Sequence, residues 1–140
     1  MAEIYTARID PELNIAVISA SGKVTPEGFY DAQDQLLENE LWRSDTDLLI
    51  VLEDDVSLEA ISFNKLAKFA APFQAWTLNH RRAPHPLTAV VCRKTIFDLA
   101  RHFWNTIKQD DWLVEVALTR SENEAMDWIH ERRASRLATA

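Results

Sequence analysis

Glycine and cysteine are both scarce in this chain of 140 residues, and each shortage excludes a class of protein. The 2 glycines, Gly22 and Gly28, are too few for a glycine-rich phosphate loop or for an all-β fold with many tight turns. Cys92 is the single cysteine, so no internal disulfide can form. The absence of G-x-S-x-G, P-loop and G-x-G-x-x-G motifs leaves hydrolase, kinase and dinucleotide-binding functions without support.

Positive charge is the minority sign, with 15 lysines and arginines against 22 aspartates and glutamates and a formal net charge of −7. The negative electrostatic field of such a protein disfavours nonspecific binding to nucleic acid or to an anionic membrane. No stretch is long enough to cross a membrane, and the N-terminus lacks a signal-type apolar run. We therefore expect a cytoplasmic protein that neither binds nucleic acid nor inserts into membranes. The local basic clusters at 80–82 and 132–136 are interpreted as a solvated loop and a solvated helix end.

The most informative stretch is 47–55, in which five apolar residues, 48 to 52, precede the carboxylates Glu53, Asp54 and Asp55. An unbroken apolar run bounded by polar residues is typical of a strand that is covered on both faces. Such strands belong to parallel or mixed sheets, where ligands and partners usually meet the carboxyl ends of the strands. The stretch therefore predicts both the centre of the core and one rim of the working surface. We expect the three carboxylates to be solvated.

Strand and helix signals alternate along the rest of the chain. Strands at 4–9 and 13–20 predict an opening hairpin around the turn residues Asp10, Pro11 and Glu12, and further strands are expected at 87–92 and 112–118. Four helices are expected, and their candidate caps are Thr25, Ser57 or Ser62, Thr95 and Ser121. Pro72 should kink or divide the second helix.

The order ββαβαβαβα predicts an α/β fold with a mixed, mostly parallel five-stranded sheet flanked by helices. We assign a single domain to residues 1–133 and a frayed tail to residues 134–140.

Metal-binding and nucleophilic motifs are weak in this sequence. No metal-ligand spacing is shared by His80, His85, His102 and His130, so we predict neither a metal nor a cofactor. Cys92 precedes Arg93 and Lys94 at a strand-to-helix junction, where an anion or a partner could bind. A cysteine-phosphatase loop would need an arginine where Asp98 stands. A buried structural cysteine is the preferred interpretation.

Several motifs agree over nearly the whole chain. The opening hairpin leads through 21–25, with the sequence SGKVT, into the first helix, and the strand at 87–92 reads LTAVVC. The closing helix carries AMDWI at 125–129. Together with the central strand, these features resemble the STAS/SEC14-type, SpoIIAA-like domains of bacteria. The resemblance implies a non-catalytic α/β domain that acts as a regulatory or protein-interaction module.

In some relatives a serine of an Asp-Ser-Ser-Gly motif is phosphorylated at the start of the helix after the central strand. Ser62 is the nearest counterpart here and the candidate phosphorylation site, although the serine pair and the glycine are both absent. That departure argues against a phosphorylation switch. The partner surface implied by this module is the carboxyl-end rim, with Asp54, Asp55, Ser57, Ser62, Arg93 and Lys94. The SEC14-type side of the resemblance suggests an apolar ligand instead.

Aromatic residues are concentrated in the two middle helices, where packing in the core is the simplest interpretation. An exposed part of this set would mark a dimer surface or an apolar pocket, for which the candidates are Phe69, Phe73, Trp76 and Trp104. We favour a homodimer. The predicted function is protein–protein interaction without catalysis. The alternatives are a carrier or sensor of a small lipid-like ligand, and an enzyme that uses the carboxylates at 53–55.

Overall fold

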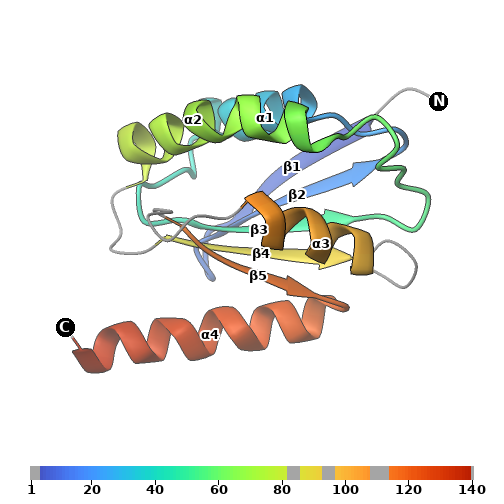
Figure 1. The fold of residues 1–140 in the computed structure, drawn as a ribbon. Helices are drawn as coiled ribbons and strands as arrows, with labels where there is room; N and C mark the ends of the chain where they lie inside the picture. Colours follow the sequence, from blue (N-terminus) through green and yellow to red (C-terminus); the bar gives the residue numbers. More distant parts are fainter. Residues whose placement is uncertain (1–3, 82–85, 93–96, 108–113, 140) are drawn as a thin grey trace.

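A five-stranded mixed sheet forms the centre of the protein, as the sequence predicted (Figure 1). The computed structural model describes residues 4–81, 86–92, 97–107 and 114–139. The strands are β1 (Ile4–Asp10), β2 (Ile15–Ser21), β3 (Asp47–Leu52), β4 (Leu87–Cys92) and β5 (Glu115–Thr119). They lie in sequence order across the sheet. The β1–β2 pair is antiparallel and the other three pairs are parallel.

Helices cover both faces of the sheet. They are α1 (Pro26–Gln35), which continues into the short η1 (Leu36–Glu38), then α2 (Phe63–His80), α3 (Phe97–Ile107) and α4 (Glu122–Thr139). Figure 1 shows α1, α2 and α3 on one face and α4 alone on the other. From β2 to β5, each connection leads to the next strand on the same side of the sheet. Because such parallel crossovers are almost always right-handed, their helices all lie on one face of the sheet.

The central strand is buried from both sides, which confirms the interpretation of its apolar run. Leu49 and Val51 of β3 pack with Ala125 and Ile129 of α4. The alternate residue Leu48 packs in the cluster on the opposite face, with residues of α1. Side chains point to alternate faces of a strand, so an unbroken apolar run is needed where both faces are covered.

Side chains near the element ends set the local turns, largely as expected. In the hairpin, Asp10 Oδ1 accepts from the backbone N–H groups of Glu12 (3.0 Å) and Leu13 (3.1 Å). Thr25 Oγ1 accepts from Gly28 N–H at 3.0 Å at the start of α1, directly before Pro26.

Ser62, not Ser57, caps α2, because its Oγ accepts from Lys65 N–H at 3.2 Å. Ser121 Oγ accepts from Glu124 N–H at the start of α4, as in a capping box. In a capping box the Glu124 carboxylate would accept from the N–H of Ser121. Here it accepts from the N–H of Arg120 instead.

Pro72 was expected to kink or divide the second helix. The structure shows α2 as one continuous helix through Pro72, so a division is wrong and the kink stays a prediction. The tail from Ala134, expected to be frayed, continues α4 to Thr139, and Arg136 within it forms an ion pair with Asp47. Strand β5 begins at Glu115, and residues 112 and 113 of the expected strand lie outside the described part of the chain, as does Thr95.

Candidate functional site

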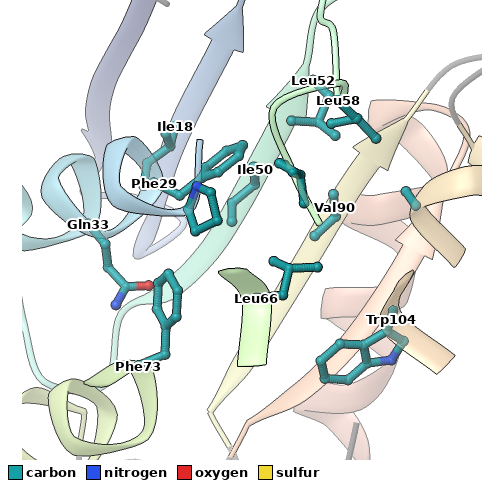
Figure 2. Close-up of a pocket in the computed structure, with 13 residues that line it drawn as sticks. Ile18, Phe29, Gln33, Ile50, Leu52, Leu58, Leu66, Phe73, Val90 and Trp104 are labelled. Carbon is teal, nitrogen blue, oxygen red and sulfur yellow. The ribbon is translucent and has the colours of Figure 1, made fainter. Parts of the chain in front are cut away.

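A cavity of about 230 Å³ lies between the helices and the sheet, on the face that carries α1, α2 and α3 (Figure 2). Its floor is made by aliphatic side chains of three neighbouring strands, namely Ile18, Ile50, Leu52 and Val90. The cavity is partly open to solvent. Floor and walls together form an almost wholly apolar lining, which suits a small apolar ligand.

Each of the three helices contributes to the walls. Phe29 and Gln33 come from α1, Leu66 and Phe73 from α2, and Ala100 and Trp104 from α3. Leu58 and Ile61, on the connection from β3 to α2, close one end. The walls therefore combine residues that lie far apart in the sequence, and in the described part of the chain no lining residue carries a charge.

Aromatic contacts hold α2 against α1 beside the cavity. The ring centroids of Tyr30 and Phe73 lie 5.6 Å apart, with the rings edge to face. Trp76 donates its Nε1–H to Asp34 Oδ1 at 3.1 Å, and its ring lies 5.8 Å from that of Trp42. Across the cavity, α3 presents the small Ala100.

The structure divides the four aromatic residues predicted for an apolar surface. Phe73 and Trp104 line the cavity. Phe69 lies instead against Tyr30, with centroids 6.4 Å apart. Trp76 is only 3% exposed and is not among the lining residues. Helical spacing places these residues on the inner side of a helix, but does not say which neighbour each one contacts.

Phe29 and Gln33 are lining residues that the sequence analysis did not single out. Gln33 follows the apolar Phe29 by four residues. Positions four apart share a helix face, so a polar residue on the same face as Phe29 was the available signal.

The rim predicted at the carboxyl end of β3 is solvated. Glu53, Asp54 and Asp55 are all exposed. The chain turns directly after β3, where Val56 N–H donates a hydrogen bond to the Glu53 carbonyl. The exposed Ser62 lies farther along the same connection, at the start of α2. Arg93 and Lys94 lie outside the described residues.

Ser57 has a structural role on this connection. Its N–H donates to the Gly22 carbonyl at 2.8 Å, and its carbonyl accepts from Val24 N–H at 3.2 Å. Gly22 has a φ of 75°, a region that glycine enters at little cost. Beside it, the hydrogen bond and charge of Lys23 lower the pKa of Glu59, whose carboxylate lies 2.8 Å from Lys23 Nζ. These contacts pin the rim connection to the end of β2.

Cys92 is a buried structural thiol, as expected. It is fully buried at the end of β4, and burial raises its pKa to about 12. At mildly alkaline pH only about one such thiol in ten thousand is ionised, and thiolate is the reactive form. We predict that Ellman's reagent leaves the native protein unlabelled for hours and labels one thiol after unfolding in urea. Rapid labelling of the native protein, as for a free thiol in solution, would contradict this.

An unexpected charged cluster lies at the opposite end of the strands, where the parallel strands β3 and β4 begin. Asp47 is fully buried, and its Oδ2 lies 2.8 Å from Arg133 Nε and 3.2 Å from Arg136 Nη2. Its Oδ1 accepts from Leu87 N–H at 3.1 Å and lies 3.9 Å from Arg81 Nη2. One carboxylate thus joins β3 and β4 to the end of α2 and to α4.

The arginines of this cluster correct the interpretation of both basic clusters as solvated. The Arg81 side chain is 2% exposed and donates to the Leu87 carbonyl at 2.7 Å. Burial lowers the pKa of Arg81 to about 10, and the charge of Asp47 opposes that shift. Arg133 donates to the carbonyls of Leu13 and Asn14, in the hairpin turn. An aspartate directly before a buried apolar run was the signal, because a buried carboxylate needs counter-charges.

Comparisons with protein-family models, with curated proteins and with solved structures give no match. The resemblance to SpoIIAA-like domains therefore stays a prediction. Within the described ranges, no helix combines the length and apolarity needed to cross a membrane. The same ranges hold no group of three or more histidine, cysteine, aspartate or glutamate side chains suited to a metal ion. The cavity is the feature from which function has to be argued.

Proposed function

We propose that the protein is a non-catalytic binding protein whose cavity holds a small apolar ligand, as a carrier or a sensor. The cavity carries this proposal, because about 230 Å³ of apolar space would otherwise cost stability. A dry engineered cavity of roughly 150 Å³ is known to bind benzene, so this one suits a ligand of roughly nine or ten non-hydrogen atoms.

A second function, regulation through a protein partner, is supported by the connection between β3 and α2. The same short segment contributes Leu58 and Ile61 to the cavity wall and exposes Asp54, Asp55 and Ser62 at the rim. A ligand that displaces the wall would therefore move the rim. On this proposal the rim binds a partner whose affinity depends on cavity occupancy, and Ser62 stays a candidate phosphorylation site.

A cytoplasmic location and a homodimer belong to the same proposal. The single buried thiol suits a reducing compartment, and the net charge of −7 disfavours nucleic acid as a partner. The aromatic residues that suggested a dimer pack largely within the subunit, whereas Leu78 of α2 is 71% exposed. Light scattering coupled to size exclusion measures the subunit count.

Native mass spectrometry of the purified protein tests the ligand proposal. We expect a species heavier than the bare chain, whose added mass leaves on denaturation and dissolves into organic solvent. A natural ligand could be lost during purification. For that case, calorimetric titration of the ligand-free protein with 1-octanol or n-propylbenzene tests whether the cavity binds an apolar molecule. A bare chain that also fails to bind either probe at millimolar concentration would overturn the proposal.

A further inference from the structure

We infer that Gln33 is the polar anchor of the cavity. On this inference the ligand is a neutral molecule with an apolar body and one hydrogen-bonding head group. The inference rests on the proposed function and specifies the chemistry of the ligand.

Gln33 is unusual among the residues that line the cavity. Its side chain extends from α1 toward Phe73 of α2 (Figure 2). The residue is 9% exposed, and its side-chain amide has no hydrogen-bond partner among the residues that the structure describes, although solvent still reaches the amide. A second glutamine of α1, Gln35, is exposed and can be hydrated. An amide at the lining of the cavity, beside Phe73, is thus left without a protein partner in the described part of the chain.

An amide that lines an apolar cavity and has no partner in the described part of the chain is available to a ligand, and such polar groups fix a ligand's orientation. An amide both donates and accepts hydrogen bonds. A hydroxyl or primary amide on the ligand can therefore pair with it, while the rest of the molecule covers the aliphatic floor at Ile50 and Val90. Among the described lining side chains, the other polar atom is the indole nitrogen of Trp104, which is a donor only. Gln33 thus sets the position of the head group.

The surroundings disfavour a charged head group. Among the residues that the structure describes, none that lines the cavity is a lysine, an arginine or a histidine, so a carboxylate in the cavity would have no counter-charge from them. The arginines around Asp47 lie where the parallel strands begin, and three of them converge on one carboxylate of the protein itself. The net charge of −7 further disfavours an anion. The ligand is therefore neutral.

Calorimetric titration with a matched set of small probes tests the inference. The probes are 1-octanol and octanamide, which carry neutral head groups, octanoate, which is charged, and n-propylbenzene, which lacks a polar group. The variant is Gln33→Met, which keeps the shape and removes the amide, and the matched control is Gln35→Met on the exposed side of α1.

We expect Gln33→Met to weaken octanamide and 1-octanol about tenfold, since one buried hydrogen bond is lost, and to leave n-propylbenzene unchanged. Gln35→Met should leave all four affinities unchanged. At neutral pH octanoate should bind the unmodified protein at least about 30-fold more weakly than octanamide. Without ligand, Gln33→Met should keep a free energy of unfolding within about 1 kcal/mol of that of the unmodified protein, because the amide makes no hydrogen bond with the described part of the chain.

The outcomes separate the inference from the proposed function. If n-propylbenzene binds but Gln33→Met leaves octanamide and 1-octanol unchanged, the anchor is wrong and the apolar cavity stands. If octanoate binds as tightly as octanamide, the neutral head group is wrong. If none of the probes binds, the proposed function fails together with the inference.

Discussion

Replacing Asp47 by alanine is expected to lower the free energy of unfolding by about 3–5 kcal/mol, the cost of removing one partner from a buried ion pair. Arg81, whose side chain is 2% exposed, would lose its counter-charge, and the N–H of Leu87 would lose its acceptor. Arg133 and Arg136 would converge on the same site without the carboxylate that holds them. A small domain is stable by only about 5–15 kcal/mol, so this single change would remove a large share.

Urea unfolding followed by circular dichroism measures the effect. Asp54→Ala is the matched control, because Asp54 is exposed just beyond the opposite end of β3, and we expect it to change stability by less than about 0.5 kcal/mol. Asp47→Asn keeps an acceptor for Leu87 N–H and serves if the alanine variant does not fold. A loss below about 1 kcal/mol for Asp47→Ala would show that the cluster contributes little to stability.

The ion pairs of Asp47 could not be predicted from the sequence. The elements and their caps were predictable because their signals are local, as Thr25 and Ser62 illustrate, each within three residues of the N–H that it accepts from. The contact between Asp47 and Arg133 spans 86 residues. Nothing in a helix's own sequence says which strand it will meet. The apolar run after Asp47 predicted burial of the strand, but not the arginines that neutralise its first residue.

The cavity shows the same limit. The apolar pattern of α2 and α3 was enough to predict Phe73 and Trp104 as candidates for an apolar surface. It could not separate them from Trp76, which turns to Asp34 on α1. A cavity is the space left when several elements fail to fill a volume, so it depends on distances between elements rather than on any one of them. The carboxylates after β3 were correctly predicted to be solvated, since charged groups without partners stay in water.

Replacing Leu66 by tryptophan should block ligand binding. Leu66 lines the cavity from α2, where Figure 2 shows it among the side chains over the sheet, so a larger ring there occupies the space of the ligand. Each buried methylene group that a ligand loses costs about 0.8 kcal/mol, and displacing roughly four of them lowers affinity by about 100-fold or more. Calorimetric titration with 1-octanol and n-propylbenzene measures that loss.

The control for this variant lies on the same helix. Leu78 is 71% exposed, so Leu78→Trp adds the same ring to α2 outside the cavity and should bind both probes as the unmodified protein does. Unfolding in urea separates blocking from damage. Filling empty space offsets the strain of a larger side chain, so Leu66→Trp should stay within about 1 kcal/mol of the unmodified protein. If a folded Leu66→Trp variant binds the probes within about threefold of the unmodified protein, the ligand site is elsewhere, because one chain cannot hold an indole and a ligand in the same space.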